Sequence, residues 1–204
     1  MKAESVAFAV AGMCFGIILG WIIGTQQARS AATPIAPVAA PAQAQSATPT
    51  QRQPPALDEA TVKSLTAVLA GDPKNVDAMV RLGNTYFDAE KFDDAITWYQ
   101  NALKIDPSNA DASTDLGVSY FYTDRPDHAL TQFEQSLKID PNHTKTLLNK
   151  GIVLAFGKQD LAAAAEEWKK VVSIAPDSPE GQAARRALEG VAAAHAQQEG
   201  GATP

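Results

Sequence analysis

A stretch of this sequence repeats itself after 34 residues, and no other feature restricts the fold as strongly. Residues 76–107 and 110–141 carry the same order of residue types, with every matched position displaced by 34. The matched pairs are Leu82 and Leu116, Gly83 and Gly117, Tyr86 and Tyr120, Ala95 and Ala129, Tyr99 and Phe133, Ala102 and Ser136, and Pro107 and Pro141. A fixed period of this length is typical of chains that stack one small structural unit on the next.

Each copy is predicted to form two helices that pack side by side. Apolar and small residues recur three, four and seven positions apart in each half of a copy, which places them on one helix face. Gly83 and Ala95 are small where the two helices must approach closely. Pro107 ends its helix because proline has no N–H to donate, and Pro126 suits a first helical turn. The expected cap residues are Asn75 and Asn109 for the first helices, and Asp93 or Asp94 and Asp124 for the second helices.

This order of residues closely resembles the tetratricopeptide repeat family, in which each unit is a helix–turn–helix. The resemblance implies an all-α repeat solenoid, because a unit of this size does not bury enough apolar surface to be stable alone. Eight helices are expected, with Leu65 and Val68 on the packed face of the first. The expected parts are a half-repeat helix at 57–70, units at 76–109, 110–143 and 144–178, a polar closing helix from 178 to 196, and a tail at 197–204.

The third copy departs from the first two. Lys150 stands where they have leucine, and Leu154 replaces tyrosine. Pro141 and Pro176 are 35 residues apart, so one residue has been inserted. The turn at 157–160 is the expected place of this insertion.

The charged residues argue against a nucleic-acid partner, and the sequence contains no recognisable catalytic or metal-binding motif. The net charge of −6 is unlike that of a nucleic-acid surface, which needs clustered lysine and arginine. No phosphate-binding glycine loop, HExxH or CxxC spacing or nucleophile elbow occurs in the sequence. We therefore expect neither an enzyme nor a bound metal or cofactor. The titratable residues interpreted as surface side chains or helix caps are His128, His143, His195, Asp93, Asp94, Glu166 and Glu167.

The resemblance also implies a binding surface. In the family, the first helix of each unit lines a concave groove that binds an extended peptide or a partner helix. The candidate groove residues are Asp77, Arg81, Asn84 and Phe87 from the first copy, Asp111, Asp115, Val118, Phe121 and Tyr122 from the second, and Lys145, Leu148, Asn149, Ile152 and Phe156 from the third. Two interpretations of the aromatic residues stay open: an exposed apolar strip for a partner, or the end of the helix-pair core near the turn.

One subtype of the family clamps the terminal carboxylate of a peptide with lysine and asparagine residues. Of its five clamp positions this sequence keeps Asn84 and Lys145, whereas Val80, Asp115 and Asn149 occupy the others. A carboxylate would be repelled by Asp115. The expected partner is therefore a mixed apolar and partly basic segment of another protein.

The N-terminal segment is predicted to anchor the chain in a membrane. Residues 6–23 carry no charge, and these 18 positions are about the length that spans a bilayer as a helix. Glycines recur on it every fourth residue and form a face for another membrane helix: Gly12, Gly16, Gly20 and Gly24. We expect a single-pass anchor at 1–24 in the cell inner membrane, a linker rich in Ala, Pro and Gln at 25–56, and a repeat domain in the periplasm. A cleaved signal peptide is the alternative, because Ser30, Ala31 and Ala32 offer a small-residue cleavage site.

These observations lead to two hypotheses of different classes. The first is a membrane-tethered scaffold that binds another protein in the groove. Its layout is similar to that of anchored repeat proteins that assist cytochrome maturation, secretion or envelope assembly. The second is a structural protein that self-associates through the glycine face and the repeat stack. If the signal segment is cleaved, a secreted soluble repeat protein results.

Overall fold

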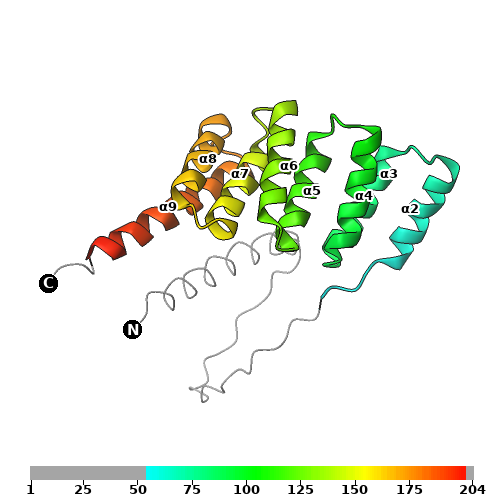
Figure 1. Ribbon diagram of the computed structural model, residues 1–204, viewed down its shortest axis with the longest axis horizontal. Helices are drawn as coiled ribbons and strands as arrows, with labels where there is room; N and C mark the ends of the chain where they lie inside the picture. Colours follow the sequence, from blue (N-terminus) through cyan, green and yellow to red (C-terminus); the bar gives the residue numbers. More distant parts are fainter. Residues whose placement is uncertain (1–53, 201–204) are drawn as a thin grey trace, which may run out of the picture. The chain divides into compact units, whose positions relative to one another are not determined.

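The computed structural model of the protein describes residues 54–200, which belong to the second of the two units of the chain, Gln53–Pro204. These residues form eight α-helices and one short π-helical segment, which follow one another along a stack (Figure 1). The elements are α2 (Glu59–Gly71), α3 (Val76–Asp88), α4 (Phe92–Ile105), α5 (Ala110–Tyr122), α6 (Pro126–Ile139), α7 (Thr144–Ile152), the π-helical η1 (Val153–Gly157), α8 (Leu161–Ile174) and α9 (Pro179–Gly200). The predicted all-α repeat solenoid is thereby confirmed for this part of the chain. The closing helix α9 ends at Gly200, four residues beyond its predicted end.

The expectations for the N-terminal segment lie outside the described residues. They are the membrane anchor, its glycine face (Gly12, Gly16, Gly20 and Gly24) and the linker as far as residue 53. The last four residues, 201–204, lie outside as well. Within residues 54–200, no helix combines the length and the apolar composition that crossing a membrane requires.

Asparagine caps the first helices of the first two repeats, as predicted. The side-chain oxygen of Asn75 accepts from the backbone N–H of Ala78 at 2.9 Å, and Asn109 accepts from Ala112 at 2.9 Å. Each cap satisfies one of the N–H groups that a helix start leaves without a partner. Pro126 occupies the first turn of α6, also as predicted.

The caps predicted for the second helices are wrong. Helices α4 and α6 begin after Lys91 and Arg125, and neither residue makes a side-chain cap hydrogen bond. Asp93 and Asp94 lie inside the first turn of α4, and the carboxylate of Asp93 accepts from Arg125 in the next repeat at 2.5 Å. Asp124 has a φ of 59°, so it belongs to the tight turn and not to the helix start.

Each repeat buries one large aromatic side chain against the glycine of its own first helix. The pairs are Gly83 with Tyr99, Gly117 with Phe133, and Gly151 with Trp168. All three aromatic residues are almost fully inaccessible to solvent. Because glycine has no side chain, the ring of the second helix occupies the space where a Cβ atom would stand. This confirms the close helix approach predicted from the small residues.

The half-repeat helix differs from the prediction at one position. Leu65 is buried, with Val62 and Leu69 half-buried beside it, but Val68 is 44% exposed. The corresponding residue of the next repeat, Ala102, is fully buried because both helices of its own repeat are present. Helix α2 has no first helix of its own among the described residues, so nothing there covers Val68.

The extra residue of the third repeat lies in a helix and not in the turn where it was predicted. The first helix of this repeat continues from α7 into η1, where the N–H of Lys158 bonds to the carbonyl of Val153 at 3.1 Å. A π-helical turn closes over one residue more than an α-helical turn, so it absorbs the insertion. The turn that follows keeps the same left-handed residue in all three repeats, with φ of 57° at Glu90, 59° at Asp124 and 57° at Gln159.

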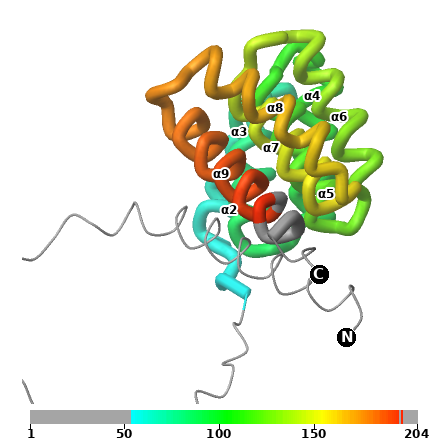
Figure 2. Tube along the Cα trace, turned by 90° about the vertical axis from the view of Figure 1, so that its left-hand side faces the viewer, coloured from blue at the N-terminus to red at the C-terminus, as the bar shows by residue number. Residues whose placement is uncertain are grey.

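The closing helix α9 covers the end of the stack nearest the viewer in Figure 2. It packs mainly on α8 and also on α7, with Ala184 buried and Leu188 half-buried against them. Arg185 is exposed on this helix and donates to the carbonyl oxygen of Pro176. Polar residues such as Gln182 and Glu189 are exposed on α9, which suits the end of a stack.

Candidate partner-binding face

Side chains of the first helices meet along one side of the stack, which we call the first-helix face. The ring of Phe87 on α3 lies 5.5 Å from that of Tyr122 on α5. The ammonium of Lys145 on α7 lies 2.7 Å from the carboxylate of Asp115 on α5. The first-helix face is defined by the predicted groove residues Asp77, Arg81, Asn84, Phe87, Asp111, Asp115, Val118, Phe121, Tyr122, Lys145, Leu148, Asn149, Ile152 and Phe156. Contacts across the repeats therefore link members of this set from all three first helices.

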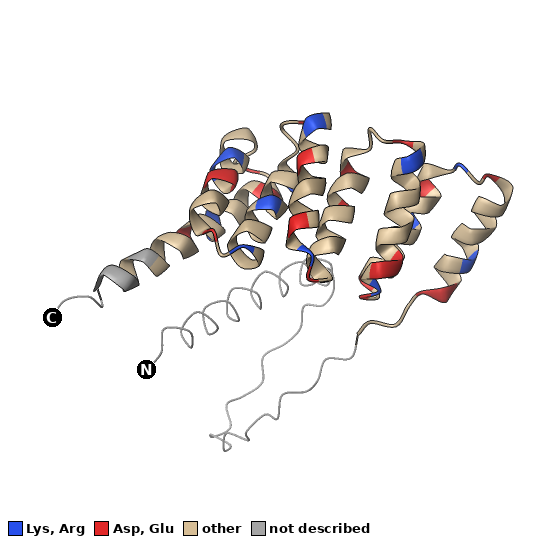
Figure 3. Ribbon diagram, viewed as in Figure 1, with Lys and Arg blue, Asp and Glu red and all other residues tan. Residues whose placement is uncertain are grey.

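The centre of this face is polar. Lys145 pairs with Asp115 at 2.7 Å and lies 3.9 Å from Asp111. Two carboxylates share one ammonium, so this group carries a net charge of −1 when both carboxylates are ionised. The side chain of Asp115 is only 19% exposed. Burial raises the pKa of its carboxyl, and the nearby Lys145 offsets this rise only in part. Elsewhere on the described helices, basic residues are interspersed with acidic ones (Figure 3).

Asp115→Asn is expected to change how stability depends on pH. In the folded chain the pKa of Asp115 is raised above its ordinary value of 3.8, which applies to the unfolded chain. Between the unfolded and the folded pKa, the folded chain therefore binds more protons than the unfolded chain. The free energy of unfolding therefore falls as pH rises through this interval, and the ionised carboxylate lowers stability at neutral pH. We expect the variant to be at least as stable as wild type at pH 7, and to lose this part of the pH dependence in urea unfolding between pH 4 and 7. Marked destabilisation at pH 7 would show that the Lys145 pair outweighs burial.

Both clamp residues that the sequence keeps are engaged within the protein. The hydroxyl of Tyr99 donates to the side-chain oxygen of Asn84 at 2.7 Å. Burial raises the pKa of this hydroxyl, and the charges of Asp115 and Asp88 raise it further, so it stays a donor. Lys145 is held by Asp115. The terminal carboxylate of a peptide would have to compete with Asp115 for Lys145, and the Asp115 carboxylate would repel it.

The other residues of the face are placed as follows. Arg81 is exposed and stands 4.0 Å from Asp77. The amide of Asn149 donates to the carbonyl oxygen of Lys145, one turn earlier, at 2.8 Å. Val118 and Ile152 are half-buried against the apolar cores of the second and third repeats.

Aromatic side chains gather at the turn end of the face. The rings of Phe87, Phe92 and Tyr122 contact one another, and those of Phe92 and Tyr122 are stacked at 4.8 Å. Phe92 was not among the predicted residues, because it begins a second helix and reaches α5 only through the stacking of repeats. Tyr122 remains 37% exposed. Phe121 packs on the core around Phe133, and Phe156 on the core of the third repeat. Phe121 and Phe156 therefore belong to the apolar core, whereas Tyr122 offers exposed aromatic surface to a partner.

A buried network of hydroxyl groups joins the second repeat to the third, and helical spacing did not predict it. The hydroxyls of Thr114 on α5, Ser136 on α6 and Thr146 on α7 lie 2.6–3.0 Å apart. Nδ1 of His143 lies 2.6 Å from the Thr146 hydroxyl. His143 was predicted to be a surface residue, but its side chain is only 18% exposed. The matching positions of the first copy carry apolar residues, and this contrast is the signal that could have revealed the network.

Asp111, His143 and Thr146 follow one another in the order of a nucleophilic triad. Nε2 of His143 faces the Asp111 carboxylate at 3.4 Å, while Nδ1 faces the Thr146 hydroxyl. However, Thr146 is 0% exposed, so no substrate can reach its hydroxyl. Among residues 54–200, no group of three or more His, Cys, Asp and Glu side chains could hold a metal ion. The arrangement serves as a contact between repeats.

An ion pair replaces apolar packing in the third repeat. Nζ of Lys150 lies 3.1 Å from one carboxylate oxygen of Glu167, and Lys170 donates to the other oxygen at 2.9 Å. The side chain of Glu167 is only 10% exposed, so its prediction as part of a solvated face is wrong. It is buried because Lys150 reaches it from the position that holds leucine in the earlier copies. Glu166 is exposed, as predicted, and pairs with Lys169.

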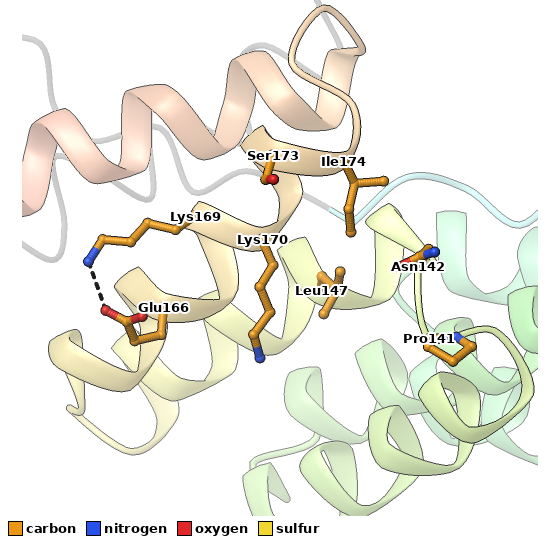
Figure 4. Close-up of a pocket in the computed structure, with 8 residues that line it drawn as sticks. All are labelled: Pro141, Asn142, Leu147, Glu166, Lys169, Lys170, Ser173 and Ile174. Atoms are coloured by element: carbon orange, nitrogen blue, oxygen red, sulfur yellow. Dashed lines mark hydrogen bonds and ion pairs between the residues drawn. The ribbon is translucent and has the colours of Figure 1, made fainter.

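Two surface hollows are lined by residues outside the first-helix face. The hollow in Figure 4 has a volume of about 380 Å³ and lies between the loop after α6 and helices α7 and α8. The second, of about 320 Å³, occupies the corresponding place one repeat earlier. Their linings include the repeat prolines Pro141 and Pro107 and the exposed Ile174 and Ile139. Both hollows follow from the repeat geometry, and we assign them no function.

Two family models match the chain. One, described as a TPR repeat, matches residues 83–123, and the other, described as a tetratricopeptide repeat, matches residues 114–179. No curated protein matches the chain.

Several solved structures have a similar fold. The first TPR of Spaghetti (RPAP3) bound to the HSP90 peptide SRMEEVD is 25% identical, with 61% of this chain and 96% of that chain covered and a TM-score of 0.54. MamA is 20% identical, with coverages of 68% and 88% and a TM-score of 0.54. The Sgt2 TPR domain from Aspergillus fumigatus is 23% identical, with coverages of 63% and 84% and a TM-score of 0.56. At their levels of identity, MamA and Sgt2 indicate likeness of fold alone.

Proposed function

Because this chain carries tetratricopeptide repeats, we propose that it is a membrane-tethered scaffold that binds a segment of another protein along the first-helix face. The observation that carries this function is the continuity of the face, in which side chains of α3, α5 and α7 contact one another across repeats. A peptide or helix lying across these helices would touch all three. Such binding needs no reactive group, and we propose no catalytic activity.

The partner is apolar and partly basic. Tyr122 offers exposed aromatic surface, and the group of Asp111, Asp115 and Lys145 carries a net negative charge. A lysine or arginine of the partner would be attracted to this group and would also suit the face of an aromatic ring. The HSP90 peptide in the RPAP3 structure contains two glutamates and ends in aspartate. The position of Asp115 and its hold on Lys145 support a partner of the opposite charge for this chain.

The tether and the location rest on the amino-acid sequence. The uncharged segment 6–23 has about the length of a membrane helix, and the linker after it is rich in Ala, Pro and Gln. In this proposal the anchor sits in an inner membrane and the repeat domain faces the periplasm. There it acts as an accessory factor in the assembly of envelope proteins or cytochromes.

Site-directed photo-cross-linking in the full-length chain tests the scaffold. A photoreactive amino acid replaces Arg81 or Asn84 on the face, or Ile139 on α6 as the control. In intact membranes we expect both face positions to cross-link to a protein other than this chain, and Ile139 not to do so. We also expect the chain to remain in the membrane fraction after alkaline extraction. Equal cross-linking from all three positions would contradict a specific face. Cross-links between copies of the chain would favour the second candidate, self-association, which the exposed Val68 on the half-repeat helix supports.

Tyr122→Ala is expected to weaken partner capture about tenfold, because tyrosine is enriched among the few interface residues that contribute most of the binding energy. The variant should stay folded, since the lost stacking on Phe92 contributes about 1 kcal/mol. Capture is measured as cross-linking yield, and folding by circular dichroism. Ile139→Ala, which removes an exposed apolar side chain of α6, is the matched control and should capture normally. If the Tyr122→Ala chain is unfolded, we would conclude instead that Tyr122 is part of the core.

A further inference from the structure

His143 occupies the place where the first two repeats have a capping asparagine. Asn75 and Asn109 accept from a backbone N–H, but His143 makes no such cap bond at the start of α7. Its ring instead contacts three side chains. Nδ1 lies 2.6 Å from the Thr146 hydroxyl and 3.4 Å from the Thr114 hydroxyl, and Nε2 lies 3.4 Å from the Asp111 carboxylate. The imidazole thus lies between the buried hydroxyl network and the charged centre of the first-helix face.

The hydroxyl network can satisfy His143 in either protonation state. With neutral imidazole, Thr146 donates to Nδ1, and Ser136 donates to Thr146. With imidazolium, Nδ1 donates to Thr146, which turns its own proton to Ser136, and Ser136 donates to the carbonyl of Ala110 at 2.9 Å. Gaining a proton therefore reverses the direction of hydrogen bonds and leaves no buried group unpaired. The fold can tolerate the change of charge.

The proton also changes the charge balance beside the hydroxyls. The charged groups that face His143 are Asp111 and Asp115 on α5 and Lys145 on α7, while α6 contributes the uncharged Ser136. Two carboxylates and one ammonium sum to −1 while His143 is neutral. They sum to 0 once it is an imidazolium, which also competes with Lys145 for Asp111.

We propose that His143 sets the charge of the first-helix face by gaining a proton as pH falls, and so weakens binding of the basic partner named in the proposed function, on which this inference rests. Histidine is the side chain whose charge ordinarily changes between about pH 5 and 8. The face is thus a pH-responsive binding surface. It holds a cationic segment more tightly at neutral pH than at mildly acidic pH.

His143→Asn is the matched variant, because it places in the third repeat the residue that caps the other two. The variant keeps His128 and His195, so any pH response that it loses belongs to His143. It also keeps Asp115, whose carboxyl has a raised pKa and could add a pH dependence of its own.

Nuclear magnetic resonance of the full-length chain without a partner tests the switch itself. Between pH 8 and 5 we expect the His143 imidazole to titrate and the Asp111 carboxyl signal to move with the same midpoint. In His143→Asn that movement of Asp111 should be absent. A His143 ring that keeps one protonation state over this range, or an Asp111 signal that ignores it, would overturn the inference.

Binding of a basic peptide tests the consequence. The probe is a fluorescent ten-residue peptide of alternating lysine and leucine, with glutamate in place of lysine as its control. We expect wild type to bind the lysine peptide about two- to fivefold more weakly at pH 5.5 than at pH 7.5, the range of one partly exposed ion pair. His143→Asn should lose less affinity than wild type over this range, keeping only the part that protonation of Asp115 contributes. An equal loss in both proteins would assign the effect to Asp115 and refute the role of His143. If the lysine peptide binds at neither pH, the basic-partner function fails, and the resonance titration still decides the switch.

Discussion

Gly117→Leu is expected to unfold the repeat stack under conditions in which the wild-type chain is folded. A Cβ atom at this position would stand 2.5 Å from Cε1 and 2.7 Å from Cδ1 of Phe133, and 3.2 Å from the carbonyl oxygen of Ala129. Phe133 cannot move aside, because its side chain is fully buried. Leucine would add further atoms to the same space and push α5 and α6 apart. The cost should be about 3 kcal/mol or more, at the upper end of the range for overpacking. Because a typical domain is stable by only about 5–15 kcal/mol, the variant should unfold at a clearly lower temperature than wild type.

Gly190→Leu is the matched control for this prediction. Gly190 also lies within a helix, α9, but a Cβ atom added there would meet nothing within 4 Å. Leucine has a higher helix propensity than glycine, so this variant should be as stable as wild type or more stable by up to about 1 kcal/mol. Thermal unfolding followed by circular dichroism measures both variants. A normal melting temperature for Gly117→Leu would refute the close pairing of glycine and aromatic ring.

Glu167→Gln should destabilise the chain by about 2–3 kcal/mol, because it removes the carboxylate opposite a largely buried lysine. Nζ of Lys150 lies 3.1 Å from Glu167, and the Lys150 side chain is only 19% exposed, so its charge has little access to water. Lys170 also loses its carboxylate partner but is more than half exposed and can be solvated. Urea unfolding at pH 7 gives the change in free energy.

The double variant Lys150→Leu, Glu167→Gln separates the charge from the packing. It places in the third repeat the residue pair that the second repeat has at the matching positions, Leu116 and Gln132. With no charge left to bury, most of the lost stability should return, since apolar replacements of buried ion pairs are often neutral or stabilising. A double variant as unstable as the single one would mean that side-chain shape, and not the unpaired charge, sets the cost.

Part of the candidate site follows from the family resemblance and helical spacing. The family resemblance implies that the first helix of each unit lines the groove, and counting along those helices then gives the set from Asp77 to Phe156. The internal partners could not be assigned in this way. The hydroxyl of Tyr99 reaches Asn84 from the second helix of the repeat, and Lys145 reaches Asp115 from the next repeat. Because of these contacts, Asn84 and Lys145, the two clamp-like residues, already have partners within the protein.

The amino-acid sequence by itself determined the repeat unit, the asparagine caps and the glycine opposite each aromatic ring. Those features depend on residues within one helix or one helix pair, where spacing and local hydrogen bonding dictate the geometry. Only the tertiary structure decided that η1 absorbs the inserted residue, that Val68 is exposed, and that His143 and Glu167 are largely buried. Each of these outcomes depends on which helix lies against which once the units stack, and residue spacing within one helix does not determine that.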